Sequence, residues 1–209
     1  MNLLKNYIQN FVSRSGNYIL SASIISRFLS FLASWIALQL ISNKELGIVL
    51  FAYNIIVFII PIGGFGLHQS LLRYGSLLKT NEEKNSLFRY TFFKGIWVTF
   101  ILIFIIVLGS YFIDFKFENT KYYLIFLSIV LIPTYLFELI KIQFRLKHKN
   151  KLFAFTEIVF TTVLTISVLI LSYYFKEKGY AIALVLTPTL SVLFFIKRIK
   201  FDLFFKEKL

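Results

Sequence analysis

One arginine lies near the middle of an otherwise apolar stretch of the chain. The stretch from Ser21 to Leu38 reads SASIISRFLSFLASWIAL. It is almost as long as the roughly 20 apolar residues that a helix needs to cross a bilayer. Arg27 shares one helical face with small polar residues at intervals of three and four, because such spacings repeat with the helical turn. These residues are Ser23, Ser26, Ser30 and Ser34.

A guanidinium inside a membrane is costly, so Arg27 is expected to face protein, water or an anionic ligand rather than lipid. A purely structural role is the alternative, in which Arg27 snorkels to the surface or pairs with an acidic residue. Snorkelling is disfavoured because about ten residues at ~1.5 Å each separate Arg27 from the membrane entry. Serines alone would be ordinary contacts between helices. The arginine among them favours a substrate-binding face formed by Arg27, Ser23, Ser30 and Ser34.

Two later stripes carry carboxylates inside apolar segments. One stripe consists of Thr134, Glu138, Lys141 and Arg145, and the other of Glu157, Thr161, Thr165 and Ser172. A carboxyl group in low dielectric can load and release a proton or cation, so Glu138 and Glu157 are candidates for ion coupling. The alternative, which we favour, is that each is an interfacial residue paired with a nearby lysine.

A cluster of helix-breaking residues ends the second apolar segment, IIPIGGFGLHQSLLRYGS. It consists of Pro61, Gly63, Gly64 and Gly66. Proline removes a backbone donor and glycine permits wide backbone angles, so this point is a candidate hinge. A plain helix end followed by a cytoplasmic helix is the alternative.

The composition is that of an integral membrane protein. The chain has 209 residues, of which 58% are hydrophobic and 19% aromatic, and its mean hydropathy is +0.76. The net charge of +13 arises from Lys and Arg between the apolar segments, which is typical of membrane orientation signals rather than of nucleic acid binding. The chain has no cysteine, which excludes disulfides and Cys-based zinc sites.

Enzymatic activity is not expected. The two histidines, His68 and His148, belong to no HExxH or Ser/His/Asp pattern, and no glycine-rich phosphate loop is present. We therefore expect no catalytic residues, no metal site and no cofactor.

The elements that must position these residues are membrane helices. Long, continuously apolar segments without period-two alternation favour helices over a barrel. We predict an all-α bundle of six spans within residues 17–197, preceded by an amphipathic interfacial segment, 1–16, and followed by a basic cytoplasmic tail, 198–209. The spans are expected at about 17–41, 46–66, 91–112, 122–142, 152–175 and 179–197.

The basic residues predict which side of the membrane each connection occupies. Sixteen Lys and Arg fall in the termini and in the second and fourth connections, against five in the alternate loops. Because these residues are retained on the cytoplasmic side, both termini are expected to be cytoplasmic.

Three stretches of the chain are informative when they are taken together. The first is SIISRFLSFLASWIALQLISNKELGIVLFAYNIIVFIIPIGGFGLHQSLLRYGS, the second IKIQFRLKHKNKLFAF and the third KGYAIALVL. Together they resemble the N-terminal half of the bacterial polysaccharide flippases, which export O-antigen, lipopolysaccharide and capsule units and belong to the multidrug, oligosaccharidyl-lipid and polysaccharide exporter superfamily. The resemblance covers most of the chain, with patterns of small, apolar and basic residues rather than an invariant signature.

The resemblance implies a transporter in the bacterial plasma membrane that flips undecaprenyl-diphosphate-linked oligosaccharides to the outer leaflet by alternating access. Arg27 matches the first-span cation of that family, and a guanidinium can bind a diphosphate or acidic sugar through paired hydrogen bonds. His68 and Arg73 would lie near the cytoplasmic mouth, where the lipid-linked substrate enters.

The resemblance also implies two bundles of about six spans, whereas this chain supplies one. We expect a fragment or a half-transporter completed by a second copy or by a C-terminal half chain. Two other functions are open: a membrane scaffold or accessory subunit that transports nothing, and a small-solute or drug exporter of the same superfamily.

Overall fold

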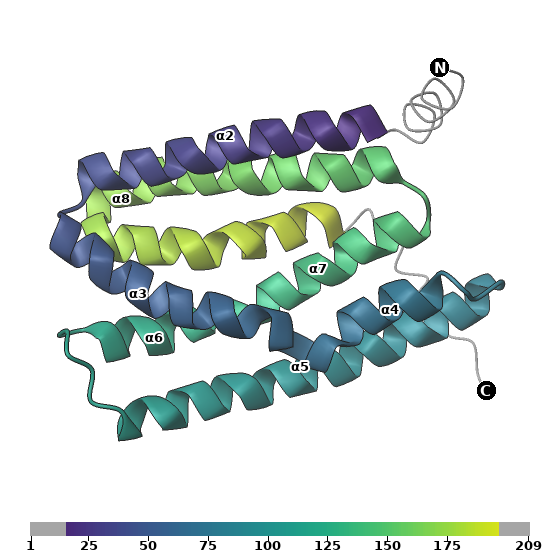
Figure 1. The fold of residues 1–209 in the computed structure, drawn as a ribbon, viewed down its shortest axis with the longest axis horizontal. Coiled ribbons are helices and arrows are strands. Elements are labelled where there is room, and N and C mark those ends of the chain that lie inside the picture. The colour runs from purple at the N-terminus through teal and green to yellow at the C-terminus, as the bar shows by residue number, and fades with distance from the viewer. Residues whose placement is uncertain (1–15, 197–209) are drawn as a thin grey trace, which may run out of the picture.

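The computed structural model describes residues 16–196, and every regular element in this range is a helix. The predicted interfacial segment and basic tail lie outside the described residues, apart from Gly16. The elements are α2 (Gly16–Leu40), α3 (Asn43–Ile59), η1 (Ile60–Gly66), α4 (Leu67–Gly75), α5 (Asn81–Phe112), α6 (Thr120–Ser128), α7 (Leu131–Leu146) and α8 (Asn150–Ile196). Figure 1 shows them as elongated rods lying side by side. The predicted all-α membrane bundle is confirmed.

Five helical stretches in the described range are long and apolar enough to cross a membrane. The last of them, α8, is interrupted at Lys176, where the backbone takes φ 51° and ψ −128°. Figure 1 shows α8 doubling back on itself, so its two arms, 150–175 and 177–196, run in opposite directions. The bundle thus contains six rods, as the six predicted spans require.

Gly179 makes this reversal of α8 possible. A side-chain carbon built on Gly179 would collide with the backbone carbonyl of Leu171 on the first arm. Only glycine lets the two arms approach this closely, since any larger residue would push the turn apart.

A face of small residues joins α2 to α8. Ala22, Ser26, Ala33 and Ala37 are buried. Small side chains let helix backbones approach closely, which is the usual way that membrane helices pack. The Thr165 hydroxyl of α8 donates to the Leu29 carbonyl oxygen of α2 at 3.0 Å. Figure 1 shows α2 and the first arm of α8 lying alongside each other over most of their length.

Local signals set several helix boundaries differently from the hydropathy pattern. The third span was predicted to begin near residue 91, but α5 begins at Asn81. Thr80 caps it, because its hydroxyl accepts from the Glu83 amide while the Glu83 carboxylate accepts from the Thr80 amide. The fourth span is divided into α6 and α7 at residues 129–130, three to four residues before Pro133, which lacks a backbone donor.

Candidate functional site

The predicted serine and arginine stripe lies on the outer surface of the bundle. Arg27, Ser23 and Ser34 are exposed and Ser30 is half-buried, whereas Ser26 is buried against α8. The stripe therefore forms one shoulder of α2, next to the face that packs on α8. The Ser23 and Ser34 hydroxyls donate to carbonyl oxygens one turn earlier in α2, so these serines are locally satisfied.

Arg27 has no carboxylate within ion-pair distance among the described residues. The packing role that was the structural alternative for Arg27 therefore lacks its acidic partner within residues 16–196. Eleven residues of helix separate Arg27 from Gly16. At ~1.5 Å per residue this is roughly 16 Å, which places the guanidinium near the middle of α2.

Glu138 and Glu157 share one lysine. Lys141 Nζ lies 2.9 Å from Glu138 Oε1 and 2.7 Å from Glu157 Oε1. The Lys141 side chain is 15% exposed, and those of Glu138 and Glu157 are 37% and 32% exposed. Pairing with a nearby lysine, the interpretation that we favoured, is what the structure shows. We call these three residues the charge triad; it carries one net negative charge.

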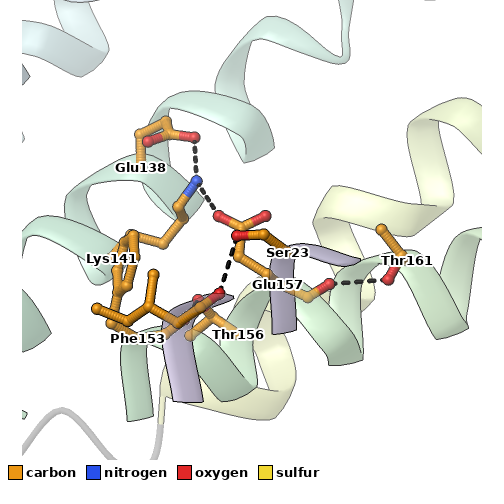
Figure 2. A network of polar contacts seen from close by, with 8 residues as sticks. Ser23, Glu138, Lys141, Phe153, Thr156, Glu157 and Thr161 are labelled. Atoms are coloured by element: carbon orange, nitrogen blue, oxygen red, sulfur yellow. Dashed lines mark hydrogen bonds and ion pairs between the residues drawn. The ribbon is translucent and has the colours of Figure 1, made fainter. Parts of the chain in front are cut away.

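The charge triad joins α7 to α8 close to α2. Figure 2 shows Lys141 pointing to both carboxylates, with Ser23 of α2 in the same view. Thr161 adds a hydrogen bond from its hydroxyl to the Glu157 carbonyl oxygen at 2.9 Å. Arg27 follows Ser23 by four residues, so it lies one helical turn, about 6 Å, further along α2.

The proline and glycine cluster breaks the helix as predicted. α3 ends at Ile59, seven residues before the end of the predicted span. Within η1, Gly64 has φ 62° and Phe65 has φ 48°, both in the left-handed region. α4 follows the break as a short separate helix, as the alternative interpretation expects, and a hinge at this point stays a prediction.

Tyr135 fills the space beside this break, a role that no pattern in the sequence indicates. A side-chain carbon on Gly64 or on Gly95 of α5 would collide with the Tyr135 ring. The Tyr135 hydroxyl donates to the Thr91 carbonyl oxygen of α5 at 2.8 Å. The Tyr135 side chain of α7 thus packs between the helix break in η1 and α5.

His68 and Arg73 of α4 lie in different surroundings. The His68 ring is 6.2 Å from the Tyr135 ring, edge to face, and its buried Nδ1 has no hydrogen-bond partner within residues 16–196. Arg73 is exposed, with its guanidinium 6.0 Å from the Tyr74 ring centre. The structure thus packs His68 against Tyr135 and leaves Arg73 at the surface.

Two hollows lie at opposite ends of the bundle. One, of about 500 Å³, is lined by Ser42, Lys44, Glu45, Ile48, Lys116, Phe117, Glu118 and Asn119. The other, of about 310 Å³, is lined by Asn81, Lys84, Asn85, Phe88, Gln143, Leu146, Lys147 and His148. Neither contains a residue of the charge triad or of the Arg27 stripe. Within the described residues, no group of three or more His, Cys, Asp or Glu could hold a metal ion.

The fold is that of known membrane transporters. No protein-family model and no curated protein matches the chain. A MOP superfamily transporter from Pyrococcus furiosus is similar in structure, with a TM-score of 0.65 and 12% identity over 95% of this chain and 46% of the other. A multidrug resistance MATE family transporter, also of the MOP superfamily, gives a TM-score of 0.60 and 17% identity over 88% of this chain and 45% of the other. The chain spans about half the length of each, and it therefore has the fold of one half of a MOP superfamily transporter.

Proposed function

We propose that the chain forms one lobe of a membrane transporter that flips an anionic, lipid-linked oligosaccharide, with Arg27 contacting the phosphate or acidic sugar. The observation that carries the proposal is the position of Arg27, which is exposed at mid-helix on a polar shoulder of α2. A guanidinium that faced lipid at this depth would be strongly unfavourable. The stripe is therefore expected to face a wet space between this lobe and a second one.

This chain covers about half of each similar transporter, which supports the presence of a second lobe. Each is about twice as long as the matched region, so a second bundle has a place beside this one in that fold. A second copy of this chain or a C-terminal half chain would supply it. A cavity between two lobes holds water, which screens the charge of Arg27 and admits an ionic substrate.

The sign of the charge on the stripe favours an anion. The Pyrococcus furiosus transporter is described as having a binding pocket of reversed polarity, which suggests a different function for that protein. Pocket polarity is thus an indicator of substrate class within this fold. Arg27 presents a planar fork that binds phosphate or carboxylate through two hydrogen bonds.

The charge triad favours a second candidate, the export of cationic drugs or solutes. Its two carboxylates outnumber the single lysine, and the carboxylates of Glu138 and Glu157 are each about one-third exposed. A cation could displace Lys141 from one carboxylate. The similar MATE family protein is described as a multidrug resistance transporter.

Substitution of Arg27 in the cell that makes the protein distinguishes these functions. Arg27→Ala should abolish surface polysaccharide while the amount of protein in the membrane stays unchanged. Arg27→Lys should keep partial export, because the charge remains but the planar fork is lost. Lys94→Ala is the matched control, since Lys94 is an exposed cation on α5, away from the stripe.

The other outcomes each favour a different function. Normal polysaccharide in Arg27→Ala cells would refute the proposed contact. Intact polysaccharide with reduced resistance to cationic toxins in Glu157→Gln cells would favour the drug exporter. If the chain is a scaffold, these substitutions should change neither surface polysaccharide nor toxin resistance. Crosslinking should then capture a partner enzyme, and deletion of the chain should cause no transport defect.

A further inference from the structure

The smaller hollow lies between the beginning of α5 and the end of α7, and it is basic. Lys84, Lys147 and His148 line it together with three amide side chains, and none of its eight lining residues is acidic. Its volume of about 310 Å³ equals that of about ten water molecules in the liquid. It is large enough for a phosphate with a small polar group attached.

The amino end of α5 borders this hollow and offers backbone amides to a ligand, while Glu82 and Glu83 in the same turn are acidic. Asn81, the first residue of this 32-residue helix, lines it. Thr80 already caps the Glu83 amide with its hydroxyl and the Lys84 amide with its carbonyl oxygen. Helix geometry leaves the amides of Asn81 and Glu82 without partners within the helix, and such amides favour anions.

A buried amide in the hollow lacks the partner that a ligand would provide. Gln143 is 4% exposed, and its Oε1 atom has no hydrogen-bond partner among residues 16–196. Gln143 lines the hollow. A buried acceptor without a donor is rare in folded proteins and calls for an explanation. A ligand hydroxyl that donates to this oxygen would satisfy it.

The end of α7 holds two of the basic side chains in place. His148 adopts φ 52°, and its amide donates to the Arg145 carbonyl oxygen at 3.0 Å. The Lys149 amide donates to the Phe144 carbonyl oxygen at 2.8 Å, which completes a Schellman motif. The Schellman motif thus fixes the backbone that carries Lys147 and His148 at the edge of the hollow.

We propose that this hollow binds the headgroup of an anionic phospholipid, with phosphatidylglycerol as its representative. The phosphate is held by Lys84, Lys147 and the amino end of α5, and a glycerol hydroxyl donates to Gln143 Oε1. Phe88 and Leu146 line the same hollow and give the lipid an apolar edge. The basic-residue count predicts that this end of the bundle is at the cytoplasmic surface, where basic pockets between membrane helices bind anionic headgroups.

Native mass spectrometry of the full-length protein tests the site, with phosphatidylglycerol and phosphatidylcholine of identical acyl chains added in turn. We expect phosphatidylglycerol to be retained and phosphatidylcholine to be lost at the same concentration. Lys84→Gln and Lys147→Gln should each weaken phosphatidylglycerol binding about fivefold, which is the equivalent of about 1 kcal/mol per basic residue. Gln143→Met, which keeps the volume but removes the acceptor, should weaken phosphatidylglycerol more than phosphatidic acid, which lacks the glycerol hydroxyls.

Two controls decide whether this hollow is the site. Lys79→Gln removes an exposed lysine of the same connection that does not line the hollow, so binding should be unchanged. Equal weakening by Lys79→Gln would overturn the proposal in favour of diffuse charge attraction. Equal retention of both lipids, or displacement of the lipid by millimolar inorganic phosphate, would also overturn it, the latter by identifying a site for free phosphate.

Discussion

Lys141 of α7 and Glu157 of α8 form the shortest ion pair among the described residues, at 2.7 Å, and the same lysine holds Glu138 at 2.9 Å. The ion pair with Glu157 joins two helices, whereas that with Glu138 spans three residues of one helix. Charges inside an apolar bundle are tolerated when they are paired, and they become costly when one partner is removed. The lysine is therefore the residue on which the stability of the charge triad depends.

Lys141→Met should destabilise the bundle by about 2 kcal/mol, less than for a fully buried pair because both glutamates are about one-third exposed to solvent. It leaves two carboxylates near each other without a cation. Thermal unfolding of the protein in detergent should show a lower Tm, by about 5 °C. Lys149→Met, which removes one exposed lysine, should leave the Tm unchanged.

A variant with a neutral charge triad distinguishes two causes of the lost stability, unpaired charge and lost packing. The triple variant Glu138→Gln, Lys141→Met, Glu157→Gln should regain most of the lost stability, because no charge is left without a partner. If the triple variant were as unstable as Lys141→Met alone, lost packing of the lysine stem, not the exposed carboxylates, would be the cause.

Gly95→Ala should destabilise the bundle by about 2 kcal/mol, because an added methyl would overlap the Tyr135 side chain. The hydroxyl of Tyr135 is the nearest atom to that methyl. The double variant Gly95→Ala, Tyr135→Phe should therefore be less unstable than the two single effects combined. The free energy of unfolding in detergent should be measured for Gly95→Ala, for Tyr135→Phe and for the double variant.

Gly109→Ala is the matched control on the same helix. No atom lies within 4 Å of a side-chain carbon built at Gly109, so only helix propensity changes. This variant should be unchanged or more stable by up to about 1 kcal/mol. If Gly109→Ala lost as much stability as Gly95→Ala, alanine would be unfavourable at either position of α5. The loss at Gly95 could then not be attributed to overlap with Tyr135.

The sequence predicted what depends on local periodicity. The polar face of α2 follows from intervals of three and four, and the six rods follow from the length of the apolar segments. The break after Ile59 follows from Pro61 and its glycines, since these residues disfavour helix wherever they occur. The boundary of α5 was missed because residues 81–86 are all polar, so that only the capping box of Thr80 and Glu83 marks where the helix begins.

Contacts between different helices could not be predicted from the sequence. The spacing of Glu138 and Lys141 predicts a pair within one helix, but Glu157 reaches the same lysine only because α7 packs against α8. Likewise, nothing in the residues around Tyr135 indicates that its ring meets glycines of two other segments. Whether the Arg27 stripe is buried or exposed also depends on which face of α2 packs, and the neighbouring alanines decide that.

The orientation of the bundle can be tested because the chain has no cysteine, so single cysteines can be introduced without background. Lys116→Cys, in a connection predicted to be outside, should react with a membrane-impermeant thiol reagent in intact cells. Lys149→Cys, in a connection predicted to be cytoplasmic, should react only after permeabilisation. Both residues are exposed. The reverse pattern would place the termini outside and would contradict the basic-residue count.

The same approach tests whether the Arg27 stripe faces water or lipid. Ser34 and Phe28 are both exposed on the bundle, but they lie on different sides of α2. A thiol reacts as the thiolate, which does not form in hydrocarbon, so Ser34→Cys should react about tenfold faster than Phe28→Cys if the stripe lines a wet space. Ala33→Cys, whose side chain is buried against the bundle, serves as the unreactive reference. Equal and slow reaction at Ser34→Cys and Phe28→Cys would mean that the stripe faces lipid, and a substrate contact by Arg27 would then have no aqueous path to reach it.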